Sequence, residues 1–231
     1  MIKTARLLLL ALCLAGIPAS VRADESSGVE RTPPPVIAPP PPVCNVGGTD
    51  ITIPYPADGF LLMPEMFRDK LTELMPEGFD LLACFMRPED PLMDDYVYGV
   101  ILERAFAKAS MDTRRFGRFM EMAEAEIPKC DPFEKFKTID FYRLKVGHPV
   151  DLGWLFDRPT EIAVARAGTY VFGETIPQMV IGSSVMLVKG KMINFFIAMR
   201  HRDENDLVWI NAELEAWAAR FRELYPAGDE K

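Results

Sequence analysis

The stretch from Gln178 to Leu224 constrains the fold more than any other part of this sequence. Its first half holds two runs rich in β-branched and aromatic residues around Lys189-Gly190, which predicts a β-hairpin. Its second half repeats apolar residues with the helical period, which predicts a helix capped by Asp203 or Asn205. The apolar stripe of this helix consists of Leu207, Ile210, Leu214, Trp217, Ala218, Phe221 and Leu224. A hairpin followed by such a helix predicts a sheet with the helix packed against it.

The rest of the sequence predicts further strands and helices of the same kind. The expected strands cover residues 50–55, 79–86, 96–106, 138–146, 161–166, 169–174, 178–188 and 191–200, with glycine turns at Gly168, Gly182 and Gly190. Two earlier helices are expected, over residues 64–75 and from Asp112 to Ile127. Segment 96–106 also has some helical spacing, but its β-branched and aromatic content favours a strand. The expected fold class is α+β, a mainly antiparallel sheet of about six strands with three helices packed on it as an α/β/α sandwich.

Two stretches of this pattern point to a known fold group. They are the opening Ile53-Pro-Tyr-Pro-Ala-Asp-Gly-Phe60, and the hairpin Met186-Leu-Val-Lys-Gly-Lys191 followed by Asp206-Leu-Val-Trp-Ile-Asn-Ala-Glu-Leu-Glu-Ala-Trp217. With the order of elements, they make most of residues 50–224 resemble the Mog1/PsbP-like α/β/α sandwich. Members of that group are mostly binding or scaffold modules. The resemblance therefore implies a binding function rather than catalysis, as an analogy at the level of fold.

The N-terminus has the pattern of a secretory signal over residues 1–23. Lys3 and Arg6 precede an apolar run over residues 7–17, and Val21-Arg-Ala23 fits a cleavage site after Ala23. Cys13 lies inside the apolar run and follows a leucine, so we expect no lipid anchor. No later apolar run reaches the length of a membrane span. The sequence therefore predicts a protein secreted to the bacterial periplasm or the extracellular space.

A proline-rich linker over residues 24–43 follows the signal, and a single domain is expected over residues 44–226. Residues 31–43 hold seven of the 20 prolines, which favours a semi-rigid polyproline II spacer of roughly 40 Å. The linker is either a passive spacer or a ligand for an aromatic groove. Residues 227–231 are expected to fray.

The charge balance excludes some classes of partner. Removal of residues 1–23 takes away three of the 26 basic residues and none of the 34 acidic ones, which leaves a net charge of −11. A chain this acidic repels phosphate backbones and anionic lipids, so neither nucleic acid nor a membrane surface is expected as a partner. Two basic clusters are candidates for binding an acidic partner, or else ordinary solvated faces. They are Arg114, Arg115 and Arg118, and Arg200, His201 and Arg202.

Three cysteines remain after signal cleavage, an odd number for an oxidising compartment. Cys84 lies within an apolar run, which predicts a buried thiol. Cys44 and Cys130 both lie near prolines in turn-like sequence. We therefore expect a Cys44–Cys130 disulfide.

Signatures of catalysis and metal binding are weak. A secreted cysteine-dependent hydrolase would use Cys84 as nucleophile, with His148 or His201 as the base. Gly182-Ser183 lacks the second glycine of a nucleophile elbow, and no cysteine or histidine spacing is that of a metal site. We expect no cofactor. The favoured hypothesis is a non-catalytic binding or scaffold domain for a protein or envelope component. The alternatives are the hydrolase and a carrier of a small molecule or a metal.

Overall fold

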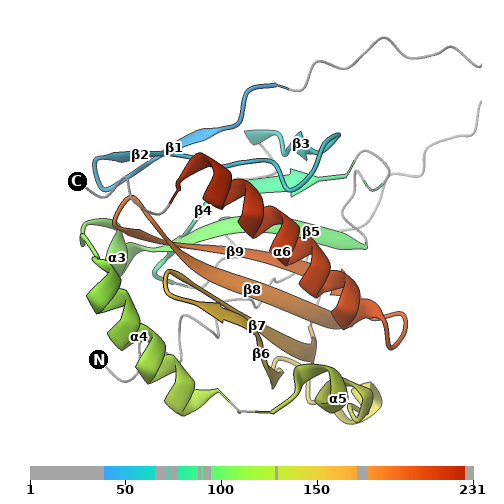
Figure 1. The fold of residues 1–231 in the computed structure, drawn as a ribbon. Coiled ribbons are helices and arrows are strands. Elements are labelled where there is room, and N and C mark those ends of the chain that lie inside the picture. Colours follow the sequence, from blue (N-terminus) through green and yellow to red (C-terminus); the bar gives the residue numbers. More distant parts are fainter. Residues whose placement is uncertain are drawn as a thin grey trace, which may run out of the picture.

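The computed structural model describes residues 39–65, 72, 77–87, 90, 95–127, 130–170 and 176–226, and it forms two antiparallel sheets (Figure 1). The small sheet pairs β1 (Val43–Val46) with β2 (Thr49–Thr52). The large sheet has seven strands in the order β3-β4-β5-β9-β8-β7-β6. Its strands are β3 (Leu61–Leu62), β4 (Phe79–Met86), β5 (Tyr96–Glu103), β6 (Val150–Arg158), β7 (Glu161–Thr169), β8 (Gln178–Val188) and β9 (Lys191–Arg200). The described helices are α3 (Arg104–Ala107), α4 (Thr113–Glu126), α5 (Pro132–Lys137), the 3-10 helix η1 (Phe141–Arg143) and α6 (Asp206–Leu224).

The β8–β9 hairpin lies near the centre of the large sheet, and it has the predicted turn. Val188 pairs with Lys191, while Lys189 and Gly190 take φ angles of 48° and 71°. Two successive positive φ angles are what a two-residue turn needs to match the twist of the strands. Glycine adopts a positive φ angle easily, which explains why the dipeptide Lys189-Gly190 correctly predicted the turn.

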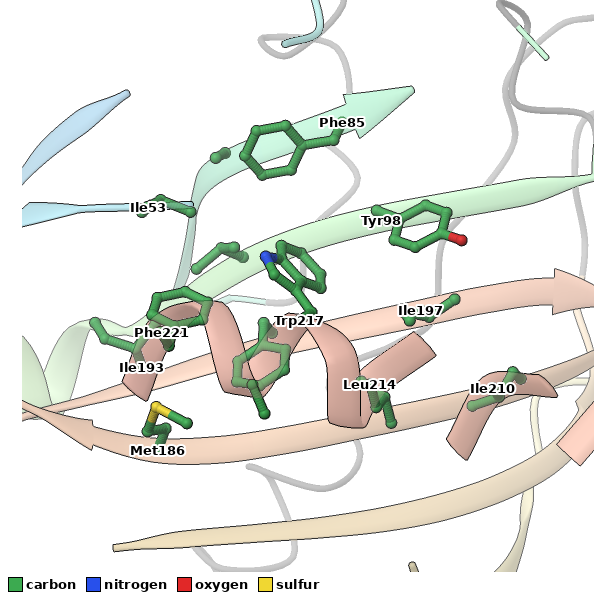
Figure 2. Close-up of a cluster of buried hydrophobic side chains, with 14 of the residues drawn as sticks. Ile53, Phe85, Tyr98, Met186, Ile193, Ile197, Ile210, Leu214, Trp217 and Phe221 are labelled. Atoms are coloured by element: carbon green, nitrogen blue, oxygen red, sulfur yellow. The ribbon is translucent and has the colours of Figure 1, made fainter. Parts of the chain in front are cut away.

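Helix α6 covers one face of the large sheet (Figure 1). Figure 2 shows Trp217 pointing from α6 toward the strands, near Phe85 of β4 and Phe221 of its own helix. The indole of Trp217 is fully buried and donates a hydrogen bond from Nε1 to the carbonyl of Pro54 at 2.9 Å. Gly182 of β8 lets α6 come close, because a Cβ at this position would lie 2.3 Å from Cγ2 of Ile210. The predicted apolar stripe therefore forms the main core, except for Leu224, which is 46% exposed at the end of the helix.

Helix α4 packs on the opposite face of the sheet. Asp112 caps it by accepting a hydrogen bond from the backbone N–H of Arg115 at 2.7 Å, as the sequence predicted. Its buried side chains meet residues of β7, β8 and β9 that alternate with those facing α6. The α4 side of this contact consists of Phe116, Phe119, Ala123 and Ile127. Helices on both faces of an antiparallel sheet confirm the expected α+β class.

The largest error of the sequence interpretation falls between residues 130 and 150. The predicted strand over 138–146 is wrong, because this segment follows the short helix α5 and contains η1. Asp131 caps α5 through the N–H groups of Phe133 and Glu134, and Asp140 caps η1 through that of Tyr142. The edge strand β6, which pairs with β7 on the side away from β8, was not predicted from the sequence.

Smaller corrections concern the glycines and the ends of strands. Gly168 and Gly182 lie inside β7 and β8 rather than in turns. Strand β5 ends at Glu103 and continues into α3, so segment 96–106 contains both of the structures that its mixed pattern suggested.

Several expectations fall outside the described residues. They are the signal at 1–23, linker residues 24–38, most of the helix at 64–75, residues 171–174 of an expected strand, and the tail at 227–231. None of the helices in the described ranges is long and apolar enough to cross a membrane.

Candidate functional site

A surface pocket of about 530 Å³ opens where three parts of the chain meet at one end of the large sheet. They are the segment from the end of α5 into η1, the start of β8, and the loop that joins β9 to α6 (Figure 1). The lining consists of Thr138, Ile139, Asp140, Phe141, Tyr142, Gln178, His201 and Arg202. Its volume falls in the range of roughly 300–1,000 Å³ that small-molecule sites occupy.

His201 is the most firmly fixed side chain in the pocket. Its backbone N–H donates to the carbonyl of Gln178 at 2.7 Å, which extends the β8–β9 pairing by one residue. The ring stacks on Phe141, with centroids 4.0 Å apart and planes 13° apart, and it meets the edge of Phe136. Its Nδ1 lies 2.8 Å from the carboxylate of Asp206. Packing and hydrogen bonding together define one orientation of the imidazole.

The buried carboxylate of Asp206 fixes the position of the β9–α6 loop. It is 5% exposed, and its Oδ2 also accepts the backbone N–H groups of Arg202 at 2.7 Å and Asp203 at 3.2 Å. An ionised carboxylate only accepts hydrogen bonds, so the shared proton lies on Nδ1 of His201. No described residue hydrogen-bonds to Nε2, which is therefore the ring nitrogen available to a ligand.

Arg202 is held by a carboxylate and an aromatic ring. Its Nη2 lies 2.8 Å from Oδ2 of Asp95, and its guanidinium carbon lies 4.9 Å from the ring centroid of Tyr96. The Tyr96 ring packs in turn against Trp209 of α6, with centroids 5.0 Å apart. A cation over an aromatic face gains roughly 0.5–1 kcal/mol at an exposed site, which favours one position of Arg202.

The same tyrosine belongs to an aromatic box around Arg87, at the end of β4. The guanidinium carbon of Arg87 lies 5.0–5.7 Å from four ring centroids, and its Nη2 lies 3.3 Å from Oε2 of Glu213. The rings are those of Phe60, Tyr96, Tyr98 and Trp209. This box joins β4 and β5 to α6, and through Tyr96 it supports the wall of the pocket that Arg202 forms.

Helix η1 supplies the opposite wall. Asp140 accepts the backbone N–H of Tyr142 at 3.1 Å, and its second oxygen lies 3.1 Å from Nε of Arg143. Phe141 turns inward beneath His201, while the next residue, Tyr142, is 93% exposed. One short helical turn therefore supplies a buried support and an exposed aromatic ring.

The two predicted basic clusters lie far apart. Arg114, Arg115 and Arg118 are exposed on α4, which begins beside the β8–β9 turn, where Met111 donates to the carbonyl of Gly190. Arg200 and Arg202 lie at the other end of β9, a strand of ten residues and hence roughly 30 Å long. The structure therefore does not join the clusters into one surface, and of these five arginines Arg202 lines the pocket.

The expected Cys44–Cys130 disulfide is wrong. Among the described residues Cys44, Cys84 and Cys130 all carry thiols. The Cys44 thiol donates to a carbonyl of β4, and the Cys130 thiol to one of β6. Four strands of the sheet lie between β4 and β6, a separation of roughly 24 Å, whereas bonded cysteines have Cα atoms within about 7 Å.

The structure also keeps the proposed nucleophile away from both histidines. Cys84 is 1% exposed in the cluster on the α4 side of the sheet, and burial raises the pKa of its thiol to about 12. His201 packs on Phe136 and Phe141, which belong to the core on the α6 side. His148 is exposed in a turn. No Cys84–histidine pair is formed.

Of the residues that line the pocket, His201 and Arg202 were candidates from the sequence, and the others were not. The signal that was overlooked is the aspartate at 131 followed by a proline, the usual start of a helix. A helix predicted at this point would have made a strand directly after it less favoured. It would have drawn attention to Asp140-Phe-Tyr142 as a second turn of helix. In the described part of the chain, no three His, Cys, Asp or Glu side chains gather in a way that could hold a metal ion.

A comparison of the chain with protein-family models, curated proteins and solved structures found no match. The assignment of function therefore depends on the chemistry of the pocket.

Proposed function

We propose that this chain is a secreted, non-catalytic binding domain, and that the pocket between η1 and the β9–α6 loop holds its ligand. The observation that carries the proposal is that the polar side chains are fixed before any ligand arrives. His201 is held by Asp206, Arg202 by Asp95 and the ring of Tyr96, and Asp140 by the backbone N–H of Tyr142. Fixed groups lose little conformational entropy on binding, so this arrangement favours recognition.

The chemistry of the pocket supports binding more than catalysis. A histidine oriented by a carboxylate is common in acyl-transfer enzymes, but there it activates a nearby nucleophile. Among the described lining residues, Thr138 is the one with an aliphatic hydroxyl, and it donates that proton to the carbonyl of Lys135 at 2.7 Å. His201 therefore acts as a hydrogen-bonding group toward the ligand.

In this proposal the proline-rich segment 24–43 is a spacer that holds the domain away from a surface. The partner is a protein or another component of the cell envelope. The prolines support the spacer role because a polyproline II segment resists collapse. The acidic net charge supports a partner that is not a phosphate polymer.

The test is crosslinking in the native envelope, followed by purification of the chain and identification of what is attached. We expect Gln178→Ala with Tyr142→Ala to reduce recovery of the partner at least tenfold. Met122→Ala is the matched control, because Met122 is also an exposed apolar side chain but lies on α4. Equal recovery by the pocket variant and the control would disprove the assignment of the site.

A second variant lacking residues 24–41 tests the spacer and leaves β1, which begins at Val43, intact. Recovery of the same partner in a reduced amount supports the spacer role, in which the segment lets the domain reach its partner. Loss of the partner only in this variant, with the pocket variant unaffected, would move recognition from the pocket to the prolines.

A further inference from the structure

The geometry of this pocket points to a neutral oligosaccharide as its ligand, an inference that rests on the proposed binding function. Three properties of the pocket lead to this class of ligand. They are an exposed aromatic ring at the rim, hydrogen-bond donors and acceptors in the wall, and charged side chains that are already paired with opposite charges of the protein.

Tyr142 supplies the aromatic ring. It is the second residue of η1, and its side chain is 93% exposed although it lines the pocket. The fold gains almost no apolar burial from this ring. The face of an aromatic ring carries partial negative charge, which attracts the weakly positive C–H groups on one face of a sugar ring. A large flat ring left in solvent beside a polar pocket is therefore suited to stacking on a sugar.

The wall of the pocket offers donors and acceptors side by side. Arg202 only donates hydrogen bonds, Asp140 only accepts them, and the Gln178 amide does both. His201 adds Nε2 as a further polar atom. A sugar hydroxyl donates one hydrogen bond and accepts two, so neighbouring hydroxyls can satisfy a wall of mixed character. A hydrocarbon ligand would leave these polar groups desolvated and without partners.

The charges of the wall argue against an ionic ligand. Asp140 is paired with Arg143 at 3.1 Å, and Arg202 with Asp95 at 2.8 Å. An anion would compete with Asp95 for Arg202, and a cation would compete with Arg143 for Asp140. The acidic partner expected from Arg200 and Arg202 therefore fits the structure less well. A neutral ligand can accept a hydrogen bond from Arg202 and donate one to Asp140 without breaking either ion pair.

The shape of the pocket agrees with a chain of sugars rather than an enclosed small molecule. The pocket is open along its rim, and it is built from loops at the end of the sheet. An oligosaccharide can place one unit against Tyr142 and extend the others along the surface.

The test uses the secreted protein on an array of oligosaccharides, followed by calorimetric titration of each that binds. The neutral members are oligomers of glucose, mannose, galactose and N-acetylglucosamine, and the anionic members are uronic-acid oligomers. We expect binding to at least one neutral series. Tyr142→Ala should weaken that binding about five- to tenfold, as expected for the loss of one stacked aromatic pair. Tyr142→Phe should retain binding within about threefold.

Val208→Ala is the control, because Val208 is an exposed apolar side chain on α6 outside the pocket lining. All three substitutions lie at exposed positions, and unchanged melting temperatures will show that the variants are folded. Absence of binding to every neutral oligomer overturns the inference, as does stronger binding to uronic acids or binding that Tyr142→Ala leaves unchanged. If no sugar binds but the pocket variant still loses its crosslinked partner, the binding function stands and the sugar class is wrong.

Discussion

At the scale of single residues, the geometry of the pocket depends on Asp206. It lies in the first turn of α6, where the helix dipole favours a negative charge, and it is almost completely buried. Asn205 occupies the N-cap position, as one of the two predicted candidates, but its side chain makes no capping bond. The carboxylate of Asp203 accepts the N–H of Asn205, and its backbone carbonyl accepts that of Asp206. Asp206 instead organises the loop by binding His201, Arg202 and Asp203 at once.

The first prediction is that Asp206→Asn lowers the free energy of unfolding by about 2–3 kcal/mol, because it weakens hydrogen bonds to a buried charged group. Urea denaturation measures this change. Asp203→Asn is the matched control and should cost less than about 1 kcal/mol, since its one hydrogen bond is exposed. A loss in Asp206→Asn no larger than in the control would show that Asp206 does not organise the loop.

The second prediction concerns the reactivity of the three thiols. Cys130 is exposed, whereas Cys84 is buried with a pKa raised to about 12. Iodoacetamide should therefore modify Cys84 in the folded protein more slowly than Cys130, by a factor on the order of 10³ or more. Mass spectrometry of peptides from folded and urea-unfolded protein measures both rates. Rapid labelling of Cys84 would restore the hydrolase hypothesis, and a peptide with Cys44 bonded to Cys130 would contradict the structure.

At the scale of elements, the sequence predicted best those parts whose signal is local. The β8–β9 hairpin and α6 follow from one turn dipeptide and one apolar stripe, and their bounds were close to the observed ones. The predicted strand over residues 138–146 was wrong because Ile139, Phe141 and Leu144 have the composition of a strand. Two aspartate caps and the burial of Phe136 and Phe141 in the core outweigh that preference.

Helix α6 is attached to the sheet by charge as well as by its apolar stripe. Arg222 of α6 lies 2.6 Å from the buried Glu161 of β7, and Glu215 of α6 lies 2.6 Å from Arg158 of β6. Burial raises the pKa of Glu161, and Arg222 and Arg158 oppose that shift. These pairs are specific in geometry, so they define the rotation of α6 about its axis more than they add to its stability.

The third prediction compares a tightly packed glycine in β8 with an unobstructed one in α4. Gly182→Ala should lower the free energy of unfolding by about 1–3 kcal/mol, because the new Cβ would lie 2.3 Å from Ile210 and 2.6 Å from Leu214. Gly117→Ala in α4 should raise it by about 0.5–1 kcal/mol, since that Cβ meets no atom within 4 Å and alanine favours a helix. Chemical denaturation of both variants measures the difference. Changes of the same sign would contradict the packing of α6 on β8.

At the scale of the whole molecule, the order of the strands determines which residues meet. No local pattern places β9 between β5 and β8. Cys84 belongs to the cluster on the α4 side of the sheet, whereas His201 packs on Phe136 and Phe141 on the α6 side. The pocket joins Asp140, Gln178 and His201, which are widely separated in the sequence. Individual elements could therefore be predicted from periodicity, whereas the site depends on long-range pairing that periodicity does not contain.

The last prediction is that the protein loses stability at alkaline pH because its core holds several weak acids. Burial raises the pKa of the Cys84 thiol to about 12 and also raises the pKa of the Tyr55 and Tyr98 hydroxyls, with the charge of Glu213 adding to the shift at Tyr98. In the unfolded chain these groups lose their protons near their ordinary pKa values. Above about pH 9 the unfolded state therefore binds fewer protons than the folded state, and stability must fall as the pH rises.

Urea titrations between pH 8 and 11 measure this loss, and variants assign it. Cys84→Ala removes one of the protons, so its stability should fall less steeply, by up to about 1.4 kcal/mol per pH unit between pH 9 and 11. Cys130→Ala is the control, because it removes an exposed thiol in place of the buried one. The slope is informative even if Cys84→Ala lowers stability at every pH. Equal slopes in the two variants would mean that Cys84 ionises in the folded protein, and its burial in the sheet would then be wrong.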